Sequence, residues 1–424
     1  MKTLARPAQV LQAINAWNAW LTPENRKEKY GKMAASPFDF YRGTNHLFWR
    51  DFAGDARLAR FGGANTWLQG DLHAENFGAF TNDKGRVVYS VNDFDEAIFA
   101  DYQYDVWRMA ISLGLAMEGV AKGDQTKVIA HFAEAYLETL ERYCQNDKEK
   151  TIEFSKKNTE GKLKKFLEDA EKDNSRAGLL RKWTTSDGEH FDLTNEDLDP
   201  VADPRWADIL AALSGYLLTL SGAGKAFDAT HLHVKDIALR LNAGTGSLGT
   251  PRYYLLVEGK SSSSKDDVIL DVKRQTKPSA HPYLSATDRE RYDQLFVNDA
   301  HRAVIAYRAM THNTDDTLGW MRLSDGHYLV RERTFVKEAF PLEMLKDEKD
   351  FQKMASQWGE ILATVHARAD RLPGVSHEES FEKTVTRMTT KHQKKFEDLV
   401  CEVALQYAGQ VQRDWETFVN AGLS

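Results

Sequence analysis

The sequence predicts an α+β protein in which a lobe built on an antiparallel sheet interrupts a lobe built of helices. Residues 228–335 hold runs of strand-like residues that are separated by turn-forming glycine and serine. On both sides of this region, apolar residues recur every three or four positions, which is the helical repeat. A chain of 424 residues has room for two or three domains. We therefore expect residues 1–200 to form the first part of the helical lobe, residues 228–335 the β-rich lobe, and residues 336–424 the helices that complete the helical lobe.

The first hundred residues combine helical and hairpin patterns. Residues 7–30 have the pattern of an amphipathic helix, which the Thr22-Pro23 pair is expected to close. Residues 36–53 are rich in aromatic side chains and are expected to pack against the site. Residues 64–99 are typical of a strand, a loop and a hairpin, with a tight turn at Asn82-Asp-Lys-Gly.

The remaining segments alternate between helical and extended patterns. Residues 104–145 are helical in pattern, and residues 146–205 are expected to form an exposed helix and a loop that crosses to the other lobe. Three segments have the composition of strands: residues 234–241, 252–257 and 268–273. Two segments near the C-terminus have the helical repeat: residues 351–365 and 378–421.

Composition narrows the class of protein. Apolar residues make up 42% of the chain and aromatic residues 11%, which is typical of a globular protein. The net charge of −7 does not favour a protein that binds nucleic acid or an acidic membrane. Cys144 and Cys401 have no CxxC partner, which argues against a disulfide framework or a zinc site. No apolar run has the length of a signal peptide core or a membrane span, so we expect a cytoplasmic protein.

Two polar motifs predict a phosphoryl-transfer site. Asp71 stands five residues before Asn76, and Asp93 and Asp95 follow an apolar run. In such a site one carboxylate orients or deprotonates a hydroxyl, whereas an amide oxygen and a second carboxylate hold Mg²⁺. Mg²⁺ prefers oxygen ligands of this kind, and it completes its shell with waters and substrate phosphates. We therefore expect Asp71, with His73 beside it, to be catalytic, and Asn76, Asp93 and Asp95 to bind the metal.

A glycine-rich segment and a lysine predict the nucleotide site. Gly244, Gly246, Ser247 and Gly249 lie between two predicted strands. A hairpin of this kind covers the phosphates in kinases, whereas a dinucleotide fold requires a helix after the glycines. Lys273 lies near the end of the next strand, from which it is expected to reach the α- and β-phosphates beneath the loop. The expected cofactors are therefore ATP and Mg²⁺.

Each motif also has a structural interpretation. Asp71 and Asn76 could stabilise a turn, and Asp93 could cap a short helix. The glycines could form a plain hairpin, and the lysine could be a solvated charge at a sheet edge. His73 could shape the loop rather than act as a base. Asp105 could brace the backbone of this loop or cap the helix that follows. The combination of these residues at these spacings favours the functional interpretation.

Several motifs resemble known families. Gly70-Asp-Leu-His-Ala-Glu-Asn76 resembles the catalytic loop of aminoglycoside phosphotransferase-type kinases, and Asp93-Phe-Asp resembles their metal-binding motif. Five motifs are similar to those of the uncharacterised family DUF2252, and they lie at residues 36–43, 70–78, 92–96, 244–249 and 318–320. This resemblance covers most of the chain. It implies a bilobal, protein-kinase-like fold.

The sequence departs from ordinary kinases in order and in detail. The catalytic and metal motifs precede the nucleotide lobe, and a helix like the one that precedes the catalytic loop in phosphotransferases lies at 359–367. Circular permutation accounts for this order, since compact folds tolerate it when the joined ends lie close together. Gln69 replaces the usual histidine, and Arg274 replaces an acid frequent in DUF2252. Glu290 is the nearest candidate for the glutamate that pairs with the lysine in kinases.

The sequence therefore predicts a permuted, kinase-like phosphotransferase that binds ATP and Mg²⁺ and acts on a hydroxyl of an unknown acceptor, either a small molecule or a protein. One alternative is a non-catalytic, nucleotide-dependent binding module, and another is nucleotidyl transfer on the same fold. A two-metal phosphoesterase is disfavoured because its further His and Asp motifs are missing, apart from a misplaced Gly43-Thr-Asn-His46. The aromatic segment Phe38–Phe52 is expected to be core rather than an acceptor pocket.

Overall fold

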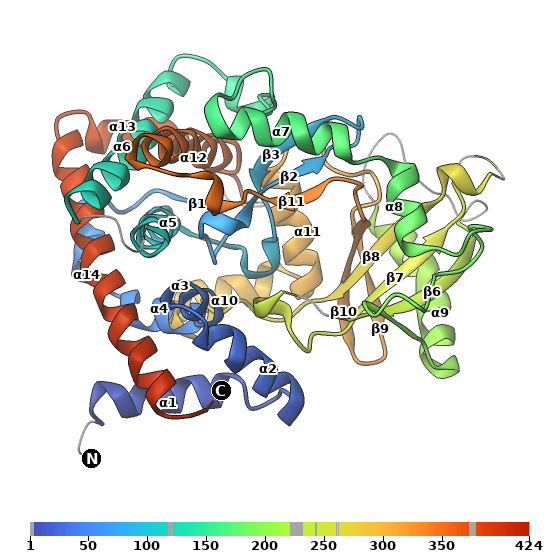
Figure 1. The fold of residues 1–424 in the computed structure, drawn as a ribbon. Coiled ribbons are helices and arrows are strands. Elements are labelled where there is room, and N and C mark those ends of the chain that lie inside the picture. The colour runs from blue at the N-terminus through green and yellow to red at the C-terminus, as the bar shows by residue number, and fades with distance from the viewer. Residues whose placement is uncertain are drawn as a thin grey trace.

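A helical lobe and a β-rich lobe lie side by side in this protein (Figure 1). The computed structural model describes residues 4–117, 122–220, 232–241, 244–259, 261, 263–372 and 379–423. The helices of the helical lobe are α1 (Arg6–Trp17), α2 (Pro23–Ala34), α3 (Pro37–Gly43), α4 (Asn45–Phe52), α5 (Gln103–Ala116), α6 (Lys122–Tyr143), α7 (Gly161–Asp173), α12 (Glu348–Arg368), α13 (Phe381–Thr389) and α14 (Gln393–Asn420). The segment between them contributes α8 (Arg176–Trp183), α9 (Asp203–Thr219), α10 (Ala286–Leu295) and α11 (Asp299–Met310).

The strands form three antiparallel sheets, so the predicted α+β class is confirmed. The largest sheet has the order β5-β6-β7-β8-β10-β9. Its strands are β5 (Leu198–Pro200), β6 (Val234–Arg240), β7 (Arg252–Val257), β8 (Val268–Arg274), β9 (Gly319–Leu323) and β10 (Gly326–Glu332). The helical lobe holds the pair β1 (Asn65–Leu68) and β4 (Ile98–Asp101), and also the sheet β11-β2-β3. These last strands are β2 (Phe77–Thr81), β3 (Val87–Val91) and β11 (Lys337–Ala339).

Strand alternation gives the large sheet one face that packs on α9 and a second face that is apolar near α8 and polar at the cavity. On β8, Leu270 and Val272 are buried in a cluster with Ile209 of α9. Successive side chains of a strand point to opposite faces, so Asp271 and Lys273 face the other way, and both line the cavity between the lobes. The strand therefore contributes its alternate residues to a core and to a site.

The N-terminal segment contains two helices rather than the single helix expected over residues 7–30. α1 ends at Trp17, and Thr22 does not close a helix but begins α2. The side chain of Thr22 accepts a hydrogen bond from the backbone N–H of Asn25 (3.2 Å), and Pro23 occupies the first position of the helix. Both features are typical of a helix N-terminus, and this is the physical reason for the break.

The end of α12 lies against the start of β1, although the two are far apart in the sequence. Thr66 Oγ1 donates to the carbonyl of His366 (2.7 Å), and the N–H of Trp67 donates to the carbonyl of Ala369 (3.2 Å). The first and last helices are also tied together, because Arg6 donates to Asp414 (2.5 Å). Both marked termini lie at the same end of the helical lobe (Figure 1).

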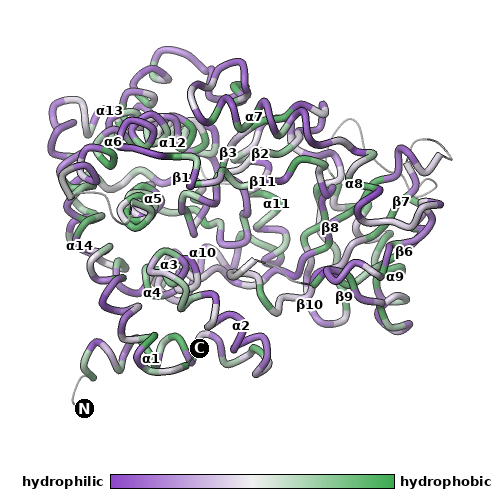
Figure 2. Tube along the Cα trace, viewed as in Figure 1, coloured by the Kyte–Doolittle hydropathy of each residue, from purple (hydrophilic) through white to green (hydrophobic). Residues whose placement is uncertain are grey.

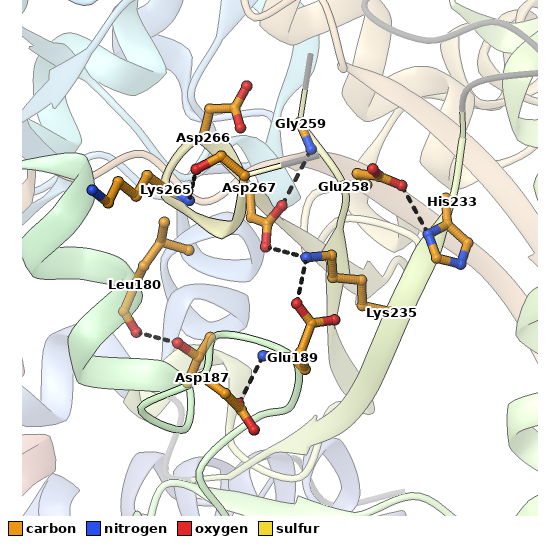
Figure 3. Close-up of polar contacts among 12 residues, drawn as sticks. Leu180, Asp187, Glu189, His233, Lys235, Glu258, Gly259, Lys265, Asp266 and Asp267 are labelled. Atoms are coloured by element: carbon orange, nitrogen blue, oxygen red, sulfur yellow. Dashed lines mark hydrogen bonds and ion pairs between the residues drawn. The ribbon is translucent and has the colours of Figure 1, made fainter. Parts of the chain in front are cut away.

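A lysine paired with two carboxylates fixes the outer end of the sheet (Figure 3). Lys235 of β6 donates to Asp267 (3.0 Å) and to Glu189 (3.1 Å), which joins the sheet to the loop after α8. Hydrophobic stretches coincide with α5 and with the strands around β7 (Figure 2). The long helices of the described segments carry too many charged residues to cross a bilayer, and none of them qualifies as a membrane span.

Candidate functional site

A cavity of about 290 Å³ lies between the lobes, and both lobes line it. Nearly every residue that the sequence predicted for the site faces this cavity: Asp71, His73, Asn76, Asp93, Asp95, Gly244, Gly246, Ser247 and Lys273. Gly249 does not line it. A Cβ at Gly249 would lie 2.7 Å from Leu21 and 3.2 Å from Asn25, so this glycine packs against the start of α2. The expected strand after the glycine-rich segment is confirmed, because β7 begins at Arg252.

Asp71 is held in place by a buried arginine that the sequence analysis did not single out. Arg108 of α5 has no exposed side-chain area, and its Nε (2.9 Å) and Nη2 both donate to Asp71 Oδ1. Its guanidinium also lies over the ring of Tyr41, 4.2 Å from the centroid. Burial raises the pKa of Asp71 to about 7, because it outweighs the attraction of Arg108. The carboxyl therefore gains and loses a proton near neutral pH.

Asp105 braces the loop that carries Asp71. Its two carboxylate oxygens accept the backbone N–H groups of Gln69 (2.7 Å) and Gly70 (3.0 Å). His366 of α12 approaches the same carboxylate at 3.4 Å, and Asp105 is only 1% exposed. Since no side chain caps α5, bracing rather than capping is the role of Asp105.

Glycine is required at position 70. Gly70 has φ = +83°, and an added Cβ would lie 2.0 Å from the carbonyl oxygen of Glu96. Both the left-handed backbone and the close approach of a neighbouring chain exclude a side chain here. The catalytic-loop motif and the Asp93 motif are therefore packed directly against each other.

Asn76 and His73 differ in what they offer to the cavity. Asn76 Nδ2 donates to the carbonyl of Asp71 (2.9 Å). Within the described part of the chain its Oδ1 makes no hydrogen bond, so that oxygen is available to a cation. His73 is buried with its Nδ1 unpartnered, and burial together with Arg42 keeps its pKa well below the usual range. His73 is therefore neutral.

Asp93 adopts a left-handed conformation and faces Lys273. Its φ is 60°, which aspartate tolerates better than most residues, and Gln69 Nε2 donates to its carbonyl (2.6 Å). Lys273 Nζ lies 3.5 Å from Asp93 Oδ1 and forms a closer ion pair with Asp95. Burial acts to raise the pKa of Asp93, but Lys273 and the neighbouring cations outweigh it and hold the pKa at about 2. Lys273 of the β-rich lobe and Asp93 of the helical lobe therefore meet across the cleft.

No helix glutamate pairs with Lys273 in the described residues. Glu290 of α10 is exposed and accepts a hydrogen bond from Gln294 instead (3.3 Å). The following helix, α11, contributes Arg302, which is fully buried. Arg302 donates to the carbonyls of Asp95 (2.6 Å) and Ala97 (2.7 Å). Arg302 therefore joins α11 to the backbone of residues 95–97, beside the ring contact between Phe94 and Tyr307.

The crossing end of the cleft, where residues 333–336 pass from β10 to β11, is strongly cationic. It is lined by the cations Arg252, Arg331, Arg333 and Lys337 and by the carboxylates Asp271, Glu332 and Glu338. Sequence reasoning missed these residues, although a charged Asp271 in the apolar strand Ile269-Leu-Asp-Val-Lys was a visible signal. The aromatic segment is mainly core as expected: Phe40, Tyr41, Phe48, Trp49 and Phe52 are buried.

The donor set fits a hard cation that shares its shell with a ligand. The described residues hold no group of three or more His, Cys, Asp or Glu side chains arranged for a metal ion. Asp93 and Asn76 nevertheless present a carboxylate and an amide oxygen to one cavity, with Asp95 beside them. Mg²⁺ is commonly bound by one or two protein oxygens together with waters and substrate phosphates. This pair therefore suits Mg²⁺ bound together with a nucleotide.

The fold and the cleft define a class: an α+β protein of two lobes with a charged site between them. A family model described as "Uncharacterized protein conserved in bacteria (DUF2252)" matches residues 21–421. The chain therefore belongs to the DUF2252 family. Neither the curated proteins nor the solved structures contain a match to it.

Proposed function

We propose that this protein is a circularly permuted, kinase-like transferase that binds Mg·ATP in the cleft and transfers a phosphorus group to a hydroxyl of an acceptor. The observation that carries the proposal is the meeting of Lys273 with Asp93 at 3.5 Å, in a cavity that Asp71 and Gly246 also line. A base, metal-binding oxygens, a phosphate-binding lysine and a glycine-rich hairpin are the parts that kinase-type phosphoryl transfer requires.

Chain topology supports the kinase-like interpretation. In protein kinases a glycine-rich loop covers the phosphates, a lysine lies on the third strand, and a helix follows that strand. Here the glycine-rich segment joins β6 to β7, Lys273 lies on β8, and α10 and α11 follow. The contact between the end of α12 and the start of β1 supports permutation, because it is the junction at which an unpermuted chain would run from this helix into the catalytic loop.

In this proposal each residue of the site has a task. Asp71 would accept the proton of the acceptor hydroxyl, and a pKa of about 7 suits a base that works near neutral pH. Arg108 fixes the orientation of this carboxylate. Lys273 would pair with phosphate oxygens once its ion pairs with Asp93 and Asp95 open. Mg²⁺, held by Asn76 and Asp93, supplies charge neutralisation when bound.

A non-catalytic, nucleotide-dependent binding module is the second candidate. The specific observation in its favour is that α10 and α11 provide no acidic partner for Lys273 within the described residues. In active kinases the ion pair between this lysine and a helix glutamate must be in place. Here Asp95 forms the ion pair with Lys273 instead. The two candidates therefore differ in whether Asp95 stays paired with Lys273 or binds the metal.

Calorimetric titration with Mg·ATP tests the site. Asp93→Ala should weaken binding only when Mg²⁺ is present, whereas Lys273→Ala should weaken it with or without the metal. Loss of one charge-assisted contact corresponds to about 1.5–3 kcal/mol, or roughly tenfold to a hundredfold in affinity. Asp83→Ala removes an exposed aspartate in the β2–β3 turn and is the control. If neither site variant changes the affinity, the cleft is not a nucleotide site.

A further inference from the structure

The crossing end of the cleft holds three cations around one carboxylate. Arg252 Nε donates to Asp271 Oδ1 (2.6 Å), and Arg252 Nη2 contacts Oδ2. Lys337 Nζ lies 3.8 Å from the same Asp271 Oδ2. Arg331 Nη1 donates to the hydroxyl of Tyr307 (2.9 Å) and has no carboxylate partner in the described residues. The cluster therefore carries a surplus of two positive charges.

Neighbouring carboxylates do not offset this surplus. Glu332 and Glu338 also line the cavity, but Glu332 pairs with Arg176 (2.8 Å). Glu338 accepts from Asn174 (2.7 Å), and Arg333 of the same lining balances its charge. The cluster at the far end of the same sheet is built differently, since Lys235 alone has two carboxylates (Figure 3). Like charges held close together repel one another, so an excess of cations at this end of the cavity indicates an anionic ligand.

The register of the sheet places this cluster in line with Lys273. Arg331 pairs with Asp271 across β10 and β8, and Arg252 pairs with Lys273 across β7 and β8. Asp271 and Lys273 are two residues apart on one face of a strand, which is a separation of about 7 Å. A row of phosphates along the strand can therefore reach from Lys273 to Arg331.

A nucleobase fits the crossing end poorly. Most ligand pockets are lined predominantly by apolar and aromatic side chains with a few polar groups. Here three arginines, a lysine and three carboxylates line the crossing end. Arg252 and Arg331 repel the ammonium group of Lys337 and contribute to lowering its pKa, and an anion bound beside it would relieve this repulsion.

We infer that the terminal phosphates of ATP bind Arg331, Arg252 and Lys337, so that the α-phosphate lies beside Lys273 and Asp93. This inference rests on the proposed Mg·ATP site and specifies the group that is transferred. The acceptor oxygen forms a bond to the α-phosphorus while the bond from that phosphorus to the bridging oxygen breaks. Asp71 takes the hydroxyl proton, and pyrophosphate leaves with the electron pair. The reaction is then nucleotidyl transfer.

Binding measurements on the full chain test this orientation without a known acceptor. The probes are Mg·ATP, AMP and inorganic tripolyphosphate, and the variants are Arg331→Leu and Lys337→Met. Each variant should weaken the binding of ATP and of tripolyphosphate at least tenfold and should change the affinity for AMP less than twofold. Arg322→Leu, on the exposed face of the edge strand β9, is the matched control and should change none of them. Urea denaturation checks that each variant is folded, and Lys337→Met replaces a side chain that is already 38% exposed.

The other outcomes separate this inference from the proposed function. If Arg331→Leu and Lys337→Met weaken the binding of AMP as much as that of ATP, the base occupies the crossing end. The inferred orientation is then wrong, although the proposed nucleotide site stands. If neither variant affects any probe, the cluster is not a phosphate site and the inference fails. The proposed function fails as well if the unaltered protein does not bind Mg·ATP, or if Asp93→Ala binds it as tightly as the unaltered protein does.

Discussion

Asp71→Asn should stabilise the protein above neutral pH, which is unusual for a substitution in a buried ion pair. The folded-state pKa of Asp71 is about 7, against 3.8 for an unperturbed aspartate. Since the folded-state value is the higher one, the folded protein binds this proton more tightly than the unfolded chain does. The stability that the protonated Asp71 carboxyl contributes is therefore fully present below about pH 4 and is lost as the pH rises to about 7.

The size of the effect follows from the shift. About three pKa units, at 1.36 kcal/mol each, correspond to roughly 4 kcal/mol as an upper limit. The attraction of Arg108 is already included, because Arg108 lowers the pKa of Asp71. Asparagine has the shape of the protonated carboxyl and does not ionise, so the Asp71→Asn variant does not lose this stability as the pH rises. Urea denaturation should show similar stabilities at pH 4.5 and a more stable variant at pH 8.

Asp93→Asn should have the opposite effect on the free energy of unfolding in the same assay. The pKa of Asp93 is lowered to about 2, so its charged form contributes stability that is present above about pH 4 and is lost as the pH falls through 2. Asp93→Asn should therefore be destabilising at pH 8. Destabilisation by Asp71→Asn at pH 8, or a difference that does not change with pH, would refute the assignment of a raised pKa to Asp71.

Further outcomes follow from the same geometry. Asp71→Asn should leave Mg·ATP affinity within about threefold and abolish transfer of label from ATP, since only the transition state uses the carboxylate; an equal loss of binding would contradict its role as base. Asp105→Asn should cost about 1–3 kcal/mol in urea denaturation, because one of two loop N–H groups loses its acceptor; an unchanged midpoint would rule out bracing. Gly70→Ala should be more destabilising than Gly85→Ala: both glycines have positive φ, but only at Gly70 would the Cβ clash with Glu96. Equal costs would mean that the loop moves away freely.

Sequence patterns predicted the helices and strands of this protein well where a short run of residues carries the pattern. The strands at 234–241, 252–257 and 268–273 lie within a residue of β6, β7 and β8. The tight turn between β2 and β3 and the helix around 351–365 are also present. The boundary at Thr22 was misassigned, because a threonine followed by a proline was taken as the end of one helix when it is the start of the next.

The sequence by itself singled out several of the polar residues that prove to line the cleft, because spacing within one loop or one strand places side chains on the same face. It could not reveal Arg108, Arg302 or Arg331, whose partners lie on other elements: Arg108 is 37 residues from Asp71, and Arg302 is 207 residues from Asp95. Isolated arginines carry no periodic signal that marks them as internal. Only the tertiary structure decided that Lys273 meets Asp93 and Asp95, that Asp105 braces the loop, and that the crossing end of the cleft is cationic, since each of these depends on how distant segments pack.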